Sequence, residues 1–384
     1  MLRYNENKLA NMDWLLVITA AFLCLFGVVT IANATCSPYS EEGVAGIAGI
    51  ISRINPYYVR LQAVWIITGT ALAVIAAYVD YRLYHRFAVY LYLFGIAMLI
   101  VVLFMPAGRG EVKNSIPITE TIGVQPGELV KLAYIVMMAK LFADRETQVK
   151  NVKDILPFLI VTAVPIALVI AQKEIGTALT YIAIFIGMMF LGGTSWKLLT
   201  GMGLVAGVSL VPAWFLLQGY QRDRILNFLD PTRDLENSGY NVLYAKTAAG
   251  SGQIWGKGLF QEGTLSQLDY VPEKHTDFIF SVTAEAVGLV GCLIIIAAFI
   301  FLLIRILRIA KTSRDVFGTM VCVGVMSMFF FHIFENICMN IGLMPVTGIP
   351  LPFLSYGGSA MWANLLGIGI CLSVALRRKQ GFFK

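Results

Sequence analysis

Residues 271–280 read VPEKHTDFIF, and they join a long polar segment to the start of an apolar one. Asp277 and Phe278 stand at this junction. An ionisable side chain at the edge of a membrane span is costly to desolvate and is therefore a candidate for function. The stretch predicts a transmembrane helix that begins beside a functional carboxylate.

Composition places the rest of the chain in a membrane as well. Of 384 residues, 58% are hydrophobic and only 14% are charged, and this is too apolar for an ordinary soluble domain. A span needs about 20 apolar residues, and ten such runs are present. They begin near Trp14, Leu61, Phe87, Glu128, Ile155, Thr177, Leu198, Phe278, Val316 and Met361. We expect an all-α polytopic membrane protein with ten transmembrane helices, forming one integral domain over residues 1–384.

The distribution of Lys and Arg predicts the orientation. Both residue types are concentrated near the N-terminus, in alternate loops and near the C-terminus, and cytoplasmic segments carry such an excess. We expect residues 1–13 and 377–384 in the cytoplasm, and residues 219–276, between spans seven and eight, as a large extracytoplasmic loop. The net charge of +6 follows from this bias, so nucleic acid is not an expected partner. The six cysteines show no CxxC and no metal-ligand spacing, which predicts neither a disulfide framework nor a zinc site.

Further polar side chains collect on the same predicted side. Glu128 and Lys131 are one turn apart at the start of span four and share a helix face. Glu174 lies between spans five and six. A polar stripe in the outer half of span nine contains His332, Glu335, Asn336 and Asn340. We expect these groups to line one outward cavity.

Two loops add to this picture. Residues 345–359 contain three prolines and three glycines, so no helix runs through them. Non-helical backbone at membrane depth has to be buried in protein or to line a wet cavity, which predicts a cavity wall. Residues 250–258 read GSGQIWGKG, but Lys257 is followed by glycine rather than Ser or Thr. This is not a phosphate-binding loop, and we expect a tight turn.

Structural explanations stay open for each polar group. Asp277 or Thr276 could cap the helix that follows. Glu128 and Lys131 could be a neutralised pair without another role, and the stripe in span nine could serve hydrogen bonding between helices.

Several long motifs resemble those of the SEDS family, the glycosyltransferases of shape, elongation, division and sporulation. The resemblance runs from about residue 60 to residue 376. The motifs that carry it are residues 228–231 (FLDP), 238–241 (SGYN), 250–252 (GSG), 256–258 (GKG), 272–280 (PEKHTDFIF) and 345–359 (PVTGIPLPFLSYGGS). The sequences at 239–241 and 263–268 favour the RodA branch over the division branch, FtsW.

The resemblance implies an activity and a setting. The family polymerises lipid II into β-1,4 glycan strands at the outer face of the bacterial cytoplasmic membrane, with inversion at the anomeric carbon. It works with a class B penicillin-binding protein, and the RodA branch works within the membrane complex for cell elongation. Lipid II, such a protein and further elongation-complex proteins are therefore the expected partners.

The same resemblance implies roles for individual residues. Asp277 matches the essential Asp of the family, and Glu128 and Lys131 match a conserved Glu and Lys. The chain departs from the family pattern near Ile116, where an aromatic residue is usual, and at Lys173-Glu174, where Pro-Asp is usual. A paired Glu of the family is Glu285-Ala286 here.

Joining a sugar hydroxyl to an anomeric carbon that leaves a lipid pyrophosphate needs a base and cationic help. We expect Asp277 to be the base. The expected substrate-binding residues are Glu128, Lys131, Glu174, Arg222, Arg224, Glu273, Lys274, His275 and Ser355. No organic cofactor is expected. A divalent cation, Mg²⁺ or Mn²⁺, could be held by carboxylates such as Glu128 or Glu174, although the chain has no Asp-x-Asp motif.

Two functions from other classes compete with the enzyme. A flippase for lipid-linked sugars could use the same polar cavity, but alternating access predicts polar residues through the whole depth and paired broken helices. A non-catalytic scaffold for wall assembly would tolerate the loss of Asp277. The polar cluster lies on one side of the predicted membrane, which favours the enzyme.

Overall fold

The computed structural model describes most of the chain. The described residues are 11–39, 46–105, 114–117, 123–145, 149–216, 219–230, 233–234 and 238–378. The expectations for the two chain ends, residues 1–10 and 379–384, lie outside them.

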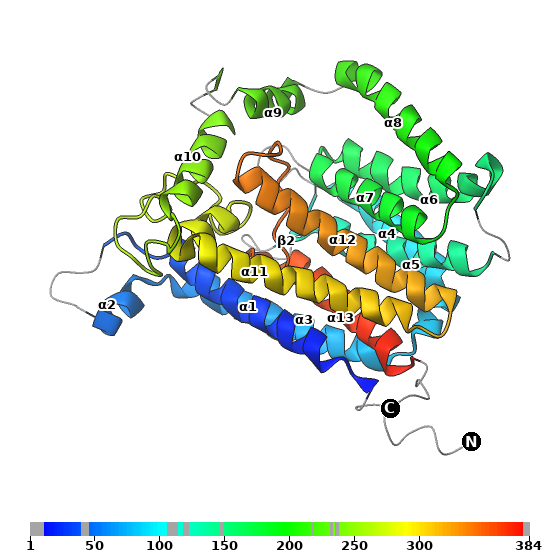
Figure 1. The fold of residues 1–384 in the computed structure, drawn as a ribbon, viewed down its shortest axis with the longest axis horizontal. Coiled ribbons are helices and arrows are strands. Elements are labelled where there is room, and N and C mark those ends of the chain that lie inside the picture. Colours follow the sequence, from blue (N-terminus) through cyan, green and yellow to red (C-terminus); the bar gives the residue numbers. More distant parts are fainter. Residues whose placement is uncertain are drawn as a thin grey trace.

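Ten long helices form the body of the described structure (Figure 1). They are α1 (Trp14–Ala34), α3 (Pro56–Tyr78), α4 (Tyr81–Leu103), α5 (Pro126–Ala143), α6 (Val152–Ala171), α7 (Ile175–Leu191), α8 (Trp196–Leu216), α11 (Ile279–Lys311), α12 (Val316–Asn340) and α13 (Gly358–Leu376). Within the described residues, seven of them are long and apolar enough to cross a membrane, and α7 is a shorter apolar helix. This confirms a polytopic all-α membrane protein, while the number of ten spans stays a prediction.

Smaller elements connect these helices. A short helix α2 (Gly46–Arg53) follows α1, and α9 (Gly219–Leu229) and α10 (Ser238–Ser251) occupy the long segment before α11. Strands β1 (Ile116–Pro117) and β2 (Gly123–Val124) pair antiparallel immediately before α5.

Aspartate side chains cap α1, α4 and α12, and some of them also pair with a neighbouring helix. Asp13 Oδ1 accepts a hydrogen bond from Leu16 N at 3.0 Å and so caps α1. The same side chain pairs with Arg305 near the end of α11 at 2.6 Å. Asp315 caps α12 through Gly318 N at 2.8 Å. These contacts fix where the spans begin and which ends lie together.

The core centres on α12 and α13. Both helices are buried along most of their length. α13 packs against α3, α5 and α12, and α12 packs against α11, α7 and α5. The polar stripe of α12 is therefore enclosed by protein instead of facing lipid.

A break divides α11 near its start. Gly288 has φ 67° and ψ −170° inside an otherwise helical run, a conformation that suits glycine because it has no Cβ. The segment 253–258 fills the break: Leu289 N donates to Gln253 O at 2.9 Å, and Gly258 N donates to Ala286 O at 2.9 Å. The tight turn expected after α10 therefore forms backbone hydrogen bonds with a transmembrane helix. These bonds satisfy N–H and C=O groups of α11 that the break leaves without a partner in the helix.

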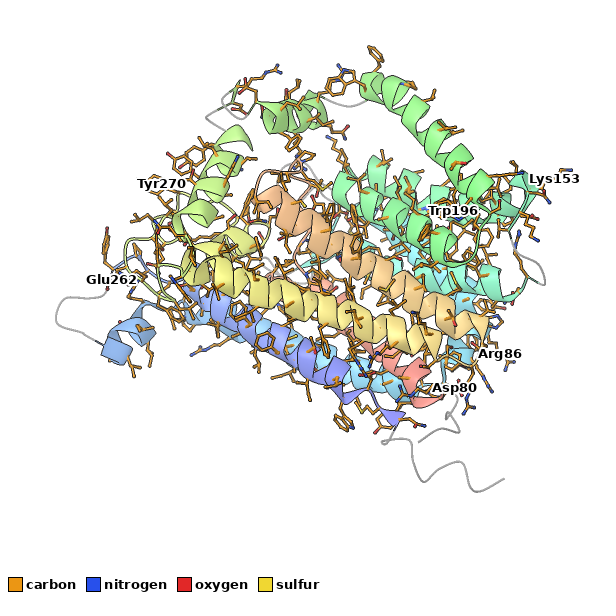
Figure 2. All side chains as sticks on the ribbon, viewed as in Figure 1. Asp80, Arg86, Lys153, Trp196, Glu262 and Tyr270 are labelled. Carbon is orange, nitrogen blue, oxygen red and sulfur yellow. The ribbon has the colours of Figure 1, made fainter. Side chains whose placement is uncertain are left out.

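The two ends of the bundle carry different loops. Figure 2 places Glu262 and Tyr270 at one end and Asp80, Arg86 and Lys153 at the other. We call the first of these the loop end because it carries the long segment before α11.

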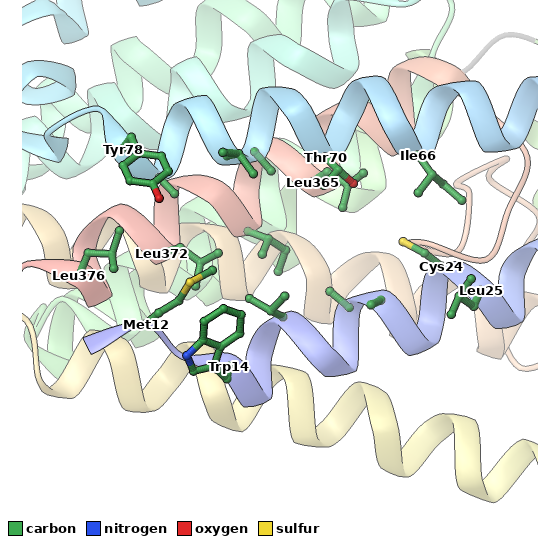
Figure 3. Close-up of a pocket in the computed structure, with 17 residues that line it drawn as sticks. Met12, Trp14, Cys24, Leu25, Ile66, Thr70, Tyr78, Leu365, Leu372 and Leu376 are labelled. Atoms are coloured by element: carbon green, nitrogen blue, oxygen red, sulfur yellow. The ribbon is translucent and has the colours of Figure 1, made fainter. Parts of the chain in front are cut away.

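An apolar groove runs along the bundle between α1, α3 and α13 (Figure 3). It measures about 440 Å³, and Trp14, Cys24, Ile66, Tyr78 and Leu372 are among its lining residues. Its position along apolar spans matches contact with hydrocarbon, and it lies apart from the charged cluster described next.

Candidate active site

Two cavities meet at Asp277. The inner cavity, of about 250 Å³, is lined by Glu128, Lys131, Glu174, Glu273, Asp277 and Gly348, among others. The lateral cavity, of about 260 Å³, is lined by Trp65, Gln125, Asp277, Gly348, Tyr356 and Ser359, among others. Asp277 and Gly348 belong to both, so the carboxylate stands where the two spaces join.

A buried ion pair lies on one side of the inner cavity. Lys131 Nζ donates to Glu128 Oε2 at 2.8 Å, and both side chains are almost fully buried. Lys131 Nζ is also 3.2 Å from His332 Nε2 on α12. Glu128 lies in the first turn of α5, which begins at Pro126, and the helix dipole stabilises a carboxylate there. The sequence expectation that Glu128 and Lys131 share a helix face is confirmed.

Glu174 faces this pair from the start of α7. Asn114 Nδ2 donates to Glu174 Oε1 at 3.3 Å. Burial raises the pKa of the Glu174 carboxyl above its usual value, and the charge of Glu128 adds to the rise. The hydrogen bond from Asn114 and the charge of Lys131 oppose it. The cavity therefore holds two carboxylates near one ammonium group.

Hydrogen bonds to its backbone carbonyl hold Asp277 in place. Asn336 Nδ2 and Asn340 Nδ2 on α12 donate to Asp277 O at 2.9 Å and 3.0 Å. Its side chain does not cap α11, because Phe278 occupies the N-cap position and no side-chain cap bond is present there. Burial raises the pKa of Asp277 to about 6; the negative charge of Glu273 adds to this rise, and Arg224 opposes it. The capping alternative for Asp277 therefore does not hold.

The segment 345–357 forms a wall of both cavities, as expected. It is non-helical, and Gly348 and Pro350 line the inner and lateral cavities. Asn336 Nδ2 donates to Ile349 O at 2.8 Å, and Ser355 Oγ donates to Thr276 O at 2.6 Å. The wall and the Asp277 segment are thus held together by direct hydrogen bonds.

Two charged side chains lie close behind this wall. Glu335 on α12 is fully buried, and Thr347 Oγ1 donates to its Oε1. Arg224 on α9 donates to Val346 O at 3.3 Å, and its charge acts on Asp277. Arg224 therefore supplies positive charge from behind this wall to the Asp277 side chain.

Other expected substrate ligands lie outside the inner cavity. Arg222 donates to Trp214 O and Phe215 O at the end of α8. Lys274 Nζ contacts Ser266 O at 2.7 Å and Asp269 at 2.6 Å. The rings of His275 and Tyr58 pack with centroids 4.8 Å apart. Ser355 is buried and bridges two backbone segments. Direct substrate contact by Arg222, Lys274, His275 and Ser355 stays a prediction.

The structural role of Glu285 was not predicted from the sequence. This residue is 1% exposed. Its carboxylate accepts hydrogen bonds from Lys257 Nζ at 2.7 Å, Leu265 N at 2.9 Å, Ser266 N at 3.0 Å and Ser266 Oγ at 2.8 Å. One side chain of α11 thereby fixes the segment before Asp277. In the sequence, Glu285 is a lone acidic residue within an apolar run. This pattern does not indicate which residues its carboxylate contacts.

Among the described residues, no group of three or more His, Cys, Asp and Glu side chains could hold a metal ion. The carboxylate of Glu128 is engaged by Lys131, and that of Glu174 accepts hydrogen bonds from Asn114 and Thr177.

A family model covering FtsW, RodA and SpoVE, described as cell cycle protein, matches residues 13–380. The chain belongs to this family. It is 37% identical over 317 residues to the peptidoglycan glycosyltransferase MrdB of Escherichia coli K12, covering 81% of this chain and 84% of MrdB. It is 32% identical over 382 residues to a probable peptidoglycan glycosyltransferase FtsW of Geobacter metallireducens, covering 98% of each chain.

A solved structure shares the fold of this family member. The match has a TM-score of 0.79 at 28% identity, and it covers 96% of this chain and 99% of the other. That structure is described as "Structural coordination of polymerization and crosslinking by a peptidoglycan synthase complex". The family resemblance seen in the sequence motifs is confirmed.

Proposed function

We infer that this chain is a peptidoglycan glycosyltransferase that joins the disaccharide units of lipid II into glycan strands. Its relatives from E. coli and G. metallireducens carry that enzyme name. The observation in this chain that carries the inference is the Asp277 carboxylate, which stands at the junction of two cavities beside the Glu128–Lys131 pair.

Asp277 is the proposed general base. With a pKa of about 6, it is mostly ionised at neutral pH and yet basic enough to accept a proton from a sugar hydroxyl. The hydroxyl oxygen bonds to the anomeric carbon, the bond from that carbon to the lipid pyrophosphate breaks, and the proton ends on Asp277. One displacement of this kind inverts the anomeric centre and needs no covalent enzyme intermediate.

Positive charge has to meet the departing pyrophosphate. Arg224 is the proposed source because it is bound to the 345–357 wall and its charge already acts on Asp277. The Glu128–Lys131 pair is proposed to orient the substrate, since its two charges are committed to each other. Glu174 is the proposed carboxylate for a divalent cation, which would add positive charge at the site.

The proposed setting follows from the same reasoning. The protein lies in the bacterial cytoplasmic membrane with both termini in the cytoplasm, and its loop end faces the extracytoplasmic side where lipid II is consumed. A class B penicillin-binding protein is the proposed partner; the similar solved chain comes from a complex described as coordinating polymerisation and crosslinking. A role in elongation, with other membrane proteins of that complex, is proposed over a role in division.

The decisive experiment supplies lipid II in detergent to the purified full chain, with and without the penicillin-binding partner. We expect glycan chains on a gel from the wild type, and a loss of at least about 100-fold in rate for Asp277→Asn, because general base catalysis contributes that much or more. Asp277→Asn preserves the shape of the side chain, and its thermal unfolding serves as the folding control.

The outcomes separate the rival functions. Undiminished product from Asp277→Asn would refute the base assignment. Transfer of labelled lipid II between the leaflets of a vesicle, with no polymer formed under any condition, would support the flippase instead. A scaffold would show neither activity and would still support wall assembly with Asn at position 277.

A further inference from the structure

A third cavity lies on the far side of the segment that carries Asp277. This outer cavity, of about 450 Å³, is lined by Cys36, Ser37, Tyr58, Gln267, Glu273 and His275, among others. Glu273 also lines the inner cavity. Residues 273–277 therefore form a partition with one cavity on each side.

Aromatic rings form part of the outer cavity. Tyr58, at the start of α3, packs against His275 at 4.8 Å and against Tyr356 at 5.3 Å between ring centroids. Tyr58 is half-buried, so one side of the cluster stays open to the cavity. Aromatic faces carry partial negative charge, and the C–H faces of sugar rings are suited to pack against them.

An unpaired polar atom lies in the wall of the same cavity. Gln267 is 1% exposed, and its Oε1 accepts a hydrogen bond from Arg53 Nη2 at 2.8 Å. Its Nε2 has no hydrogen-bond partner among the described residues. A buried donor without a partner is costly, and a ligand hydroxyl or carbonyl oxygen would satisfy it once a small shift of the amide turns Nε2 toward the cavity.

The charges of the outer cavity disfavour a phosphate ligand. Among the described residues that line it, the positively charged side chain is that of Lys274. Its ammonium group already contacts Asp269 at 2.6 Å and Ser266 O at 2.7 Å. Glu273 adds a further negative charge to the wall. A neutral, hydroxyl-rich ligand fits this balance better than a pyrophosphate.

We propose that the outer cavity is a saccharide-binding subsite, which holds sugar units of a glycan chain against Tyr58 and His275. This inference rests on the proposed function, because a polymerase has to hold two saccharide partners at once. Glu273 lines both the outer and the inner cavity, so sugar units held in the outer cavity lie next to the site without occupying the space in which the two reacting groups meet.

The test measures binding instead of turnover. The probe is a lipid-free tetrasaccharide of alternating N-acetylglucosamine and N-acetylmuramic acid, which has no leaving group. It is titrated into the full-length protein in detergent and followed by saturation-transfer NMR. We expect Tyr58→Phe to bind like the wild type and Tyr58→Ala to bind about fivefold more weakly, since an aromatic contact is worth roughly 1 kcal/mol.

A second variant guards against a folding defect at Tyr58. Ser37 is exposed and lines the outer cavity, so Ser37→Trp is expected to obstruct it and weaken binding without disturbing the core. Trp255 is an exposed aromatic residue that lines none of the three cavities, so Trp255→Ala is the matched control and is expected to leave the affinity for the probe unchanged. Thermal unfolding checks each variant.

Each outcome decides between the two proposals. Equal affinity of the wild type, Tyr58→Ala and Ser37→Trp, or no binding at all, overturns the subsite even if the protein polymerises lipid II. Inorganic pyrophosphate that binds in a Tyr58-dependent manner in place of the tetrasaccharide also overturns it. Tyr58-dependent binding by a protein that makes no polymer leaves the subsite standing and removes the proposed function.

Discussion

At the scale of single residues, the chemistry rests on a carboxylate with few direct contacts. Within the described part of the chain, no hydrogen bond reaches the side-chain oxygens of Asp277, although its backbone is firmly held. Its affinity for protons is therefore set by burial and by neighbouring charges, chiefly Glu273 and Arg224. Changes to those two neighbours are expected to tune the base without touching it.

The pH profile of polymerisation tests this dependence. Because the active form of Asp277 is ionised, activity is expected to fall as pH drops through about 6. Glu273→Gln removes a negative charge that raises this pKa, so the acid limb is expected to move to lower pH. Rates measured from pH 5 to 8 with saturating lipid II check the shift. An acid limb that stays in place after Glu273→Gln contradicts the assignment.

Variants of the buried Glu128–Lys131 pair can distinguish an effect on stability from an effect on activity. Lys131→Met leaves a buried carboxylate without its partner and is expected to cost about 3–5 kcal/mol of unfolding free energy. The exchanged pair, Glu128→Lys with Lys131→Glu, restores opposite charges and is expected to recover most of that loss while polymerisation stays impaired. Thermal unfolding and gel assays on the same preparations check both parts. Parallel losses of stability and activity in the exchanged pair would support a purely structural role.

At the scale of elements, the break in α11 joins the membrane span to the segment before it. Gly288 has positive φ, and a Cβ at this position would overlap backbone atoms of Trp255 and Gly256. The backbone of 253–258 can enter the helix because no side chain stands in its way. Glu285, three residues earlier, then fixes residues 265 and 266.

Gly288→Ala is expected to expel this segment and to destabilise the protein by more than the roughly 1–3 kcal/mol that a sparsely populated positive-φ conformation costs an L-residue. Gly193→Ala is the matched control, because Gly193 also has positive φ, at 78°, but a Cβ there would meet nothing within 4 Å. Unfolding midpoints and polymerisation rates of the two variants are compared. Equal effects of the two substitutions would mean that backbone conformation alone, and not the packed segment, explains Gly288.

The elements that the sequence predicted are those encoded by local patterns. The apolar runs and the proline-rich wall at 345–359 depend on neighbouring residues, and each has its counterpart in the structure. The break at Gly288 was not predicted, because its cause is the approach of residues 253–258, at least 30 positions earlier in the chain. The role of Glu285 was missed for the same reason, since its donors come from positions 251 to 266.

At the scale of the whole molecule, the arrangement of loops makes the predicted orientation testable. Glu262 and Lys153 lie at opposite ends of the bundle (Figure 2). In cells whose outer face alone is exposed to a charged thiol reagent, Glu262→Cys is expected to be labelled and Lys153→Cys to be protected until the membrane is permeabilised. The background replaces Cys36, the cysteine outside the long helices. Labelling of Lys153→Cys in intact cells would reverse the proposed orientation.

The two amide bonds from Asn336 and Asn340 to the carbonyl of Asp277 have a mechanical consequence. They fix the position of Asp277 relative to α12, which is among the most buried helices. In the chain, however, Asp277 directly precedes α11. If α9 or α10 shifts to admit a lipid substrate, these two hydrogen bonds are expected to keep Asp277 in its place beside α12. The reactive group is thereby anchored to the buried centre of the bundle and not to its periphery.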